Sequence, residues 1–236
     1  MPTKRKNTSV ANRLLAALPK KDYQKLLAAS EPVTLVFGDI LFEPGDNIRH
    51  VYFPNDGIVS LLSTVGEGEH VEVGMVGNEG MAGLPVFMGV SKSRTRALVQ
   101  GEGSALRMKS AALRKETSNG SPLNKLLHLY THSLMTQISQ SAACNRFHQV
   151  NPRLARWLLM THDRTAGDEF RLTQEFLSQM LGVRREGVTL AAGALQKQKL
   201  ISYSRGQIKI LDRAGLEATS CKCYEVVKDE YDNFLA

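Results

Sequence analysis

The stretch from Leu172 to Leu190 constrains the fold of this chain more than any other part of its sequence. A helix-turn-helix needs a small residue where its two helices cross, a glycine in the turn, and apolar residues on the inner face of both helices. The seven constrained positions all carry a suitable residue: Leu177, Ser178, Leu181, Gly182, Val183, Val188 and Ala191. Thr173 is a suitable N-cap for the first helix. The stretch therefore predicts a helix-turn-helix whose second helix covers about residues 184–197.

A two-stranded wing is predicted directly after this motif. Residues 200–211 have the pattern of a helix end, a strand, a tight turn at Arg205-Gly206 and a second strand. A wing beside a helix-turn-helix can place Arg205 and Lys209 on a phosphate backbone.

The charge of the chain is concentrated in the same region. Residues 150–215 hold eleven basic and six acidic residues, a net charge of +5, whereas residues 22–149 sum to −1. A basic domain favours a polyanionic partner, although a solvated surface rich in Lys and Arg has the same composition.

The N-terminal turn of the second helix is the part that enters the major groove in helix-turn-helix proteins. An arginine can bind guanine with two hydrogen bonds, and a glutamate can accept one from cytosine. The alternative for each charge is an ordinary exposed helix residue. We predict eight DNA-contacting residues: Thr173, Gln174, Arg184, Arg185, Glu186, Thr189, Arg205 and Lys209.

The N-terminal half predicts a sandwich of short antiparallel strands. Between Val33 and Met108, short apolar segments alternate with Gly-, Pro- and Asn-rich turn signals. We expect strands at residues 50–54, 58–65 and 70–75. A helical segment at residues 11–30, interrupted at Pro19, precedes them.

One long helix should follow Ser121 and Pro122, which are a good N-cap and a good first helical residue. A heptad-like stripe runs along it, formed by Leu123, Leu127, Tyr130, Leu134, Ile138 and Ser141. Such a stripe packs on a second copy of the chain, on the sheet of its own domain, or on both, because the stripe is wide.

These motifs together resemble the Crp/Fnr family of bacterial transcription regulators over about residues 10–215. The resemblance is carried by Leu172-Thr173, Gly182-Val183, Arg185-Glu186, Val188 and Leu200-Ile201, and by Asn151 to Arg156. It implies that Arg185 and Glu186 contact bases and that Thr173 contacts a phosphate. Two positions depart from the family pattern. Leu190 replaces a third reading arginine, and Gly187 replaces a common threonine at a cost of about 1 kcal/mol to the helix relative to alanine.

The resemblance implies an α+β architecture of four parts. These are a cyclic-nucleotide-binding-like jelly roll (10–120), a dimerisation helix and hinge (121–149), a winged helix-turn-helix (150–216) and a C-terminal tail (217–236). It also implies a homodimer that binds palindromic, double-stranded promoter DNA in the cytoplasm, with no membrane partner. RNA polymerase is a further partner if the protein activates transcription.

The sensor domain departs more from the family. The closest alignment puts Ala82-Gly83 where cyclic-nucleotide binders carry a Gly-Glu pair that meets the ribose. We therefore expect cyclic AMP to bind weakly. Glu79, Arg94 and Arg96 are the candidates for binding a different, unidentified effector.

The sequence shows no clear cofactor signal. Three cysteines are too few for the usual four-cysteine iron–sulfur cluster, and no histidine has the context of a haem ligand. His128 and His132 are four residues apart, and Cys221 and Cys223 two apart, but polar or packed residues have the same spacing. Cys144 has the pattern of a small packed residue. We expect no metal site and no certain cofactor.

No catalytic constellation or phosphate-binding Gly-rich loop is present, so we do not expect an enzyme. No apolar run is long enough to span a bilayer. Two alternatives to a DNA-binding regulator remain. One is a regulatory module that uses the winged helix to bind protein, and the other is a winged helix that binds RNA.

Overall fold

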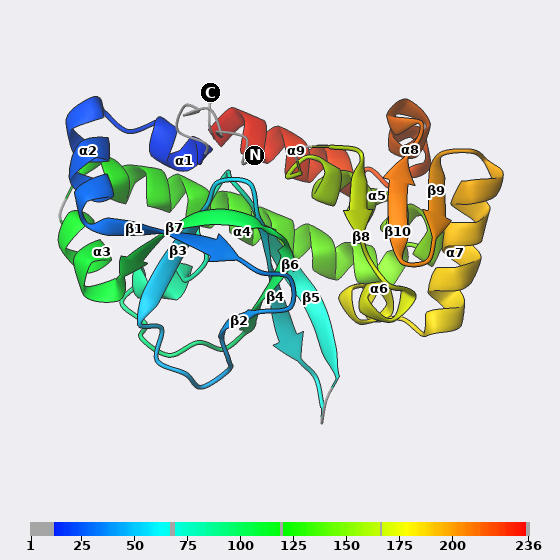
Figure 1. Cartoon of the computed structure of the whole chain (residues 1–236), viewed down its shortest axis with the longest axis horizontal. Coiled ribbons are helices and arrows are strands. Elements are labelled where there is room, and N and C mark those ends of the chain that lie inside the picture. The colour runs from blue at the N-terminus through cyan, green and yellow to red at the C-terminus, as the bar shows by residue number, and fades with distance from the viewer. Residues whose placement is uncertain (1–11, 67–68, 119, 166, 235–236) are drawn as a thin grey trace, which may run out of the picture.

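The computed structural model describes residues 12–66, 69–118, 120–165 and 167–234. Two antiparallel sheets form the N-terminal domain. One has the order β1 (Ser30–Leu35), β7 (Gly103–Lys109), β3 (His50–Pro54); the other has the order β2 (Ile40–Phe42), β6 (Arg96–Gly101), β4 (Ile58–Thr64), β5 (His70–Val76) (Figure 1). Val51 and Phe53 of the first sheet, and Val59 and Val99 of the second, are completely buried. The predicted β jelly roll is confirmed, and the three expected strands match within one residue.

The helical segment before the jelly roll is two helices, α1 (Arg13–Ala16) and α2 (Lys20–Ala28). Pro19 is the N-cap of α2, which explains the interruption. Ser30 already belongs to β1, and Ala11 lies outside the described residues. The buried Asn12 caps α1 by accepting a hydrogen bond from the Leu15 amide, and its side chain donates to the carbonyls of Pro54 and Gly80.

The long helix is α4 (Pro122–Phe147), which follows η1 (Leu84–Val86) and α3 (Ser110–Glu116). The Ser121 hydroxyl caps α4 by accepting a hydrogen bond from the Asn124 amide. Most of the predicted stripe lies against the protein's own core, because Leu123, Leu127, Tyr130 and Leu134 are all at most 5% exposed. These four residues pack within the chain, whereas Ile138 of the same stripe is 37% exposed.

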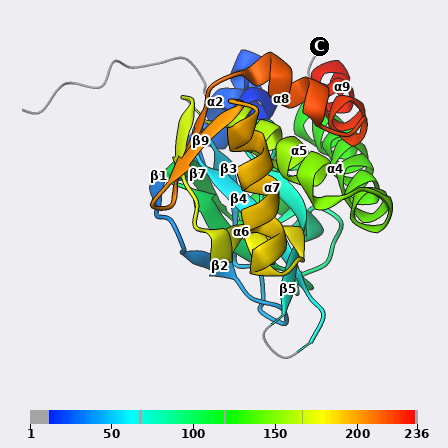
Figure 2. The same ribbon diagram turned by 90° about the vertical axis from the view of Figure 1, so that its right-hand side faces the viewer.

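The C-terminal domain begins with α5 (Val150–His162) and contains α6 (Gln174–Leu181) and α7 (Arg185–Lys197). Figure 2 looks onto α7, with α6 beside it. The wing strands β9 (Ile201–Ser204) and β10 (Gln207–Ile210) are joined by a third strand, β8 (Glu169–Arg171), in the order β8-β10-β9. The wing is therefore a three-stranded sheet rather than the two-stranded hairpin expected.

Of residues 217–236, expected to be a tail, the described part (217–234) is largely helical. The helix α8 (Arg213–Thr219) is followed by α9 (Cys223–Phe234), which packs along α4 (Figure 1). Val227 and Tyr231 of α9 are buried, and the Tyr231 hydroxyl accepts a 2.8 Å hydrogen bond from the Gln137 side chain. The C-terminal residues thus belong to the folded core beside the long helix.

The two domains share a buried polar contact. Arg164 follows α5, and its guanidinium lies 2.9 Å from the Glu79 carboxylate in the loop after β5; both side chains are at most 6% exposed. A second link joins α5 to β5, since the Trp157 indole donates a 2.9 Å hydrogen bond to Glu72. None of the helices in the described ranges is both long and apolar enough to cross a membrane.

Candidate nucleic-acid interface

The predicted helix-turn-helix forms as its local sequence requires. The Thr173 hydroxyl caps α6 by accepting a 3.1 Å hydrogen bond from the Phe176 amide. Gly182 ends α6 with φ +59° and ψ 44°, a conformation that costs glycine nothing but strains other residues. Leu177, Val188 and Leu195 are fully buried and fasten α6 and α7 together.

A groove opens between the start of α6, the exposed face of α7 and the turn of the wing. Five of the predicted DNA-contacting residues line it: Thr173, Gln174, Arg185, Thr189 and Arg205. The Thr189 hydroxyl donates to the Gln174 side chain at 3.1 Å, which joins the two helices across the groove floor. The Thr173 hydroxyl accepts a bond at the cap, so its own hydrogen is available to donate.

Arg184 and Glu186 lie outside this groove lining but are exposed at the first turn of α7. Among the described residues, no acidic side chain forms an ion pair with Arg184, Arg185 or Arg205. Their charges are therefore available to a ligand. Lys209 differs, because its ammonium lies 2.7 Å from the Glu169 carboxylate across the wing sheet. That hydrogen bond raises the pKa of Lys209.

The wing tip is a tight turn in which both central residues have positive φ, +50° at Arg205 and +76° at Gly206. This is the geometry of the hairpin turn that best matches the strand twist, and Asn-Gly is its favoured sequence. An arginine at the first position costs some stability and places a cation at the tip.

Sequence reasoning missed three further polar residues that line the groove: Gln196, Tyr203 and Ser204. Gln196 lies seven positions after Thr189, so helical spacing alone could have placed it on the same face. The Tyr203 hydroxyl donates a 2.9 Å hydrogen bond to the Leu172 carbonyl, which fixes the wing to the start of the motif. Burial raises the pKa of Tyr203, which keeps this donor protonated.

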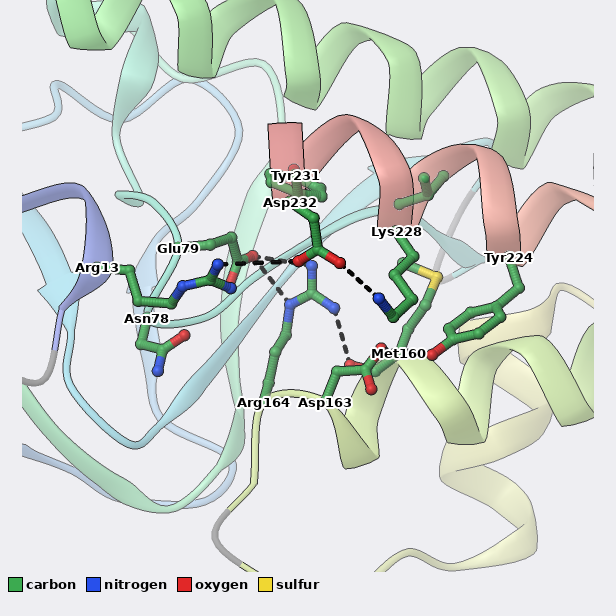
Figure 3. Close-up of a pocket in the computed structure, with 11 residues that line it drawn as sticks. Arg13, Asn78, Glu79, Met160, Asp163, Arg164, Tyr224, Lys228, Tyr231 and Asp232 are labelled. Atoms are coloured by element: carbon green, nitrogen blue, oxygen red, sulfur yellow. Dashed lines mark hydrogen bonds and ion pairs between the residues drawn. The ribbon is translucent and has the colours of Figure 1, made fainter. Parts of the chain in front are cut away.

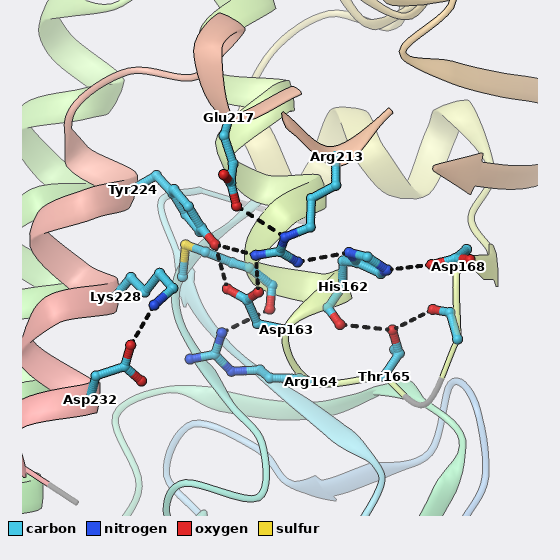
Figure 4. A network of polar contacts seen from close by, with 12 residues as sticks. His162, Asp163, Arg164, Thr165, Asp168, Arg213, Glu217, Tyr224, Lys228 and Asp232 are labelled. Atoms are coloured by element: carbon cyan, nitrogen blue, oxygen red, sulfur yellow. Dashed lines mark hydrogen bonds and ion pairs between the residues drawn. The ribbon is translucent and has the colours of Figure 1, made fainter. Parts of the chain in front are cut away.

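An ionic network fixes α8 and α5 behind this surface (Figure 4). The Arg213 guanidinium donates to Asp163 at 2.6 Å and to the Tyr224 hydroxyl at 2.7 Å, and its Nε donates to Glu217 at 3.0 Å. Because Arg213 follows the wing directly, this network ties the wing sheet to both α5 and α9.

The three candidate effector residues have different surroundings. Glu79 borders a pocket between α1, α5 and α9, where its carboxylate holds Arg164 (Figure 3). Arg96 donates a 2.8 Å hydrogen bond to Glu43, and Arg94 is exposed. The structure gives Glu79 and Arg96 separate ionic partners, and their assignment to an effector stays a prediction.

The expectation of no metal site and no cofactor is wrong. Cys144, His148, Cys221 and Cys223 come together, with ligand atoms that all lie within 4.8 Å of one another. The sequence shows the last two as neighbours, but their partners lie more than 70 positions earlier, at the end of α4. Only the packing of α9 on α4 brings the two pairs together.

Comparison with protein families agrees with this architecture. Residues 32–119 match the cyclic nucleotide-binding domain, and residues 152–219 match the Crp-like helix-turn-helix domain. A search of curated protein sequences finds no significant match.

Solved structures share the fold at low sequence identity. FixK2 from Bradyrhizobium japonicum is 16% identical, with a TM-score of 0.69 over 81% of this chain and 98% of its own. A regulator described as a putative Crp/Fnr member from Eubacterium rectale is 17% identical, with a TM-score of 0.67 over 87% and 96%. The c-di-GMP-responsive global regulator CLP from Xanthomonas campestris is 16% identical, with a TM-score of 0.61 over 81% and 99%.

The two family matches cover the jelly roll and the winged helix-turn-helix in the order of the fold, on either side of α4. The motifs at Thr173, Gly182 and Arg185-Glu186 have the local geometry of that helix-turn-helix. The chain belongs to the Crp/Fnr family of transcription regulators.

Proposed function

We propose that this regulator binds a palindromic site in promoter DNA as a homodimer and reads it with α7. The observation that carries the proposal is the groove between α6, α7 and the wing, where Arg185 and Arg205 lie beside neutral hydrogen-bonding side chains. Arg185 and Glu186 on the first turn of α7 are the proposed base readers. Thr173, Gln174 and Arg205 are the proposed phosphate contacts.

The proposed dimer uses an exposed face of α4. Most of the predicted stripe is occupied within the chain, but its member Ile138 is exposed. Ile138 forms a second stripe with Thr131, Met135 and Ala142, at spacings of four, three and four. Met135 is 62% exposed and Ile138 is 37% exposed. Heptad spacing on a long helix favours a second copy of the same helix as the partner. Two copies paired there would present their α7 helices to half-sites about 34 Å apart, one turn of DNA.

An effector in the jelly-roll domain is the proposed control. The similar Xanthomonas regulator is described as responsive to c-di-GMP, which supports ligand control in this fold. Here Glu79 links the jelly roll to Arg164 after α5. A ligand that competes for Glu79 would release Arg164 and favour a different placement of the DNA-binding domain. If the protein activates transcription, RNA polymerase is the further partner.

Selection from a random duplex library, with wild type and the Arg185→Ala variant, tests this function. We expect wild type to enrich a two-fold symmetric sequence. Arg185→Ala should lose about 1–3 kcal/mol at one base pair of each half-site and relax the preference there. Arg49→Ala, which removes an exposed arginine of the jelly roll, is the control and should enrich the wild-type sequence.

The same selection distinguishes the alternatives. If wild type enriches no sequence, or if Arg185→Ala enriches the same motif as wild type, base reading by α7 is contradicted. Stronger competition by duplex RNA than by duplex DNA would instead indicate an RNA-binding winged helix.

A further inference from the structure

Four potential metal ligands meet where α4 ends. Cys144 lies on the last turn of α4, and His148 is its C-cap. Cys221 and Cys223 lie where α8 passes into α9. The three cysteines are buried, at 0%, 9% and 6% exposure, and the ligand atoms of all four residues lie within 4.8 Å of one another.

Two of the distances between these atoms match those of ligands on one tetrahedral ion. The Cys144 and Cys221 sulfurs are 3.5 Å apart, and the Cys223 sulfur is 3.6 Å from the His148 Nδ1. Zinc bonds to sulfur at about 2.3 Å and to imidazole nitrogen at about 2.0–2.1 Å, so tetrahedral ligands lie roughly 3.5–3.8 Å apart. A disulfide would instead require a sulfur–sulfur distance of about 2.0 Å.

The donor set also selects the ion. Three cysteines and one histidine form a common ligand set of structural zinc sites, in which all four positions are filled by protein. Soft thiolates disfavour magnesium and calcium, which prefer oxygen. The close spacing leaves room for a single ion rather than for an iron–sulfur cluster, whose usual ligands are four cysteines.

The surroundings suit a negatively charged centre. Zn²⁺ with three thiolates and a neutral imidazole carries one excess negative charge. Arg156 donates a 3.0 Å hydrogen bond to Ser141, and Arg153 donates a 2.8 Å hydrogen bond to Asn145. Both guanidinium groups therefore lie beside the end of α4 that carries Cys144. Both arginines are at most 7% exposed, and the Nε of each is buried without a hydrogen-bond partner in the described structure. The negative charge of a zinc ion bound by three thiolates would compensate these two buried positive charges.

We propose that Cys144, His148, Cys221 and Cys223 bind one Zn²⁺ ion that fastens the end of α4 to the start of α9. His148 caps α4, and Gln149 is the N-cap of α5, so the ion lies at the hinge between the long helix and the DNA-binding domain. Arg153 connects this hinge to the helix-turn-helix, because its guanidinium donates to the Leu181 carbonyl at the end of α6. Occupancy of the site therefore restrains the orientation of the domain that carries α7.

Metal analysis of the purified full-length chain tests the site. We expect one zinc per chain, and after chelation we expect Co²⁺ to bind with the absorption bands of tetrahedral thiolate coordination. Mutation of a residue that only supports a metal ligand typically lowers metal affinity by about 10–100-fold. Cys221→Ser removes a ligand itself, so we expect it to weaken zinc binding by at least about 100-fold. His148→Ala removes an exposed side chain, so the variant should fold and still lose the metal.

His128→Ala is the matched control, because it removes another exposed histidine from α4 outside the cluster. It should keep full zinc content and the wild-type cobalt spectrum. The proposal is overturned if wild type takes up no more zinc than Cys221→Ser. It is also overturned if mass spectrometry finds a Cys144–Cys221 disulfide in a protein that binds no zinc.

The effect of the ion on DNA rests on the proposed function. We expect zinc-free protein to bind its DNA site more weakly by a factor of about 5–150, the usual range of coupling between two sites. Metal content and cobalt spectra are measured without DNA. Failure of the zinc site and failure of DNA binding therefore give separate results.

Discussion

Arg205 has a backbone conformation that is unfavourable for arginine, and it is one of the proposed DNA contacts. It has φ +50° at the first central position of the wing turn, which favours asparagine or glycine. Its charge has no ionic partner within the described residues, and it borders the groove beside α7. The proposed phosphate contact of Arg205 would offset the cost of an arginine in this turn.

Arg205→Asn should therefore separate stability from DNA binding. We expect the free energy of unfolding to stay the same or rise by up to about 1 kcal/mol, because asparagine tolerates positive φ. DNA affinity should fall similarly for all sequences, and the slope of log affinity against log salt should decrease by about 1. Urea denaturation and salt titrations of binding measure both. An unchanged salt slope would remove Arg205 from the phosphate contacts.

Glu72 is a titrating residue between the domains. Its Oε1 accepts the Trp157 indole hydrogen bond, and its Oε2 is buried without a partner among the described residues. Burial, only partly opposed by the hydrogen bond from Trp157, raises the pKa of Glu72 to about 7. The folded protein consequently holds this proton at pH values where the unfolded chain has lost it.

The raised pKa predicts that stability falls as pH rises from about 4.5 through 7, because the carboxylate is disfavoured in the folded state. Glu72→Gln removes this titration. Relative to wild type, the variant should gain about 1–3 kcal/mol between pH 5 and pH 8. Denaturant unfolding at several pH values measures the difference, and parallel curves for the two proteins would contradict it.

At the scale of single residues, the local motifs could be predicted from the sequence. The Thr173 cap, the Gly182 turn and the Ser121 cap each depend on neighbours within four residues, and the structure has all three. Pairs such as Glu79–Arg164 join residues 85 positions apart. The sequence contains no signal that would match one carboxylate with one distant arginine.

Among the elements, α4 has two apolar faces with different partners. Leu127, Tyr130 and Leu134 face the protein's own core, whereas Met135 and Ile138, the latter a member of the predicted stripe, are exposed. The heptad pattern correctly indicated a helix with a packed stripe. It could not distinguish packing within the chain from packing between chains, because both need the same spacing.

Ile138→Glu should disrupt the proposed dimer without unfolding the chain. A glutamate at the centre of a helix–helix seam is buried opposite its own copy, and an unpaired buried charge costs about 3 kcal/mol or more. The dissociation constant of the dimer should therefore rise at least about 100-fold in sedimentation equilibrium. Ala143→Glu adds the same charge to another exposed face of α4 and should leave the dimer intact. Equal behaviour of the two variants would exclude this seam.

The elements missed from sequence were short or lay beyond the resemblance. Strand β8 has three residues, too few for a readable alternation. Helix α9 does carry a helical pattern, because Tyr224, Val227 and Tyr231 fall at spacings of three and four. That pattern predicts an amphipathic helix but does not identify α4 as the surface it covers.

At the scale of the whole molecule, the order of the domains was predictable and their contact was not. A jelly roll, a long helix and a winged helix-turn-helix follow one another as the motifs indicated. The buried Glu79–Arg164 pair, close to Tyr130 and Tyr231, lies where the domains meet. In the proposed control by an effector, this contact is the one through which a ligand near Glu79 would act on α5.

Glu79→Gln should weaken this contact strongly. It leaves Arg164 buried without its counter-ion, which typically costs about 3–5 kcal/mol. Urea denaturation measures the loss. The double variant Glu79→Gln/Arg164→Met removes both charges and should recover part of it, giving a favourable coupling energy. Purely additive losses would show that the pair does not stabilise the domain interface.

Genome-wide capture of DNA bound to the full-length protein tests the central claim most directly. The proposed function predicts bound fragments that share a two-fold symmetric motif, with half-sites one helical turn apart and located in promoters. Arg185→Ala, captured in parallel, should lose the preference at one position of each half-site. Capture of fragments with no shared motif, or of the same motif by both proteins, would contradict sequence reading by α7.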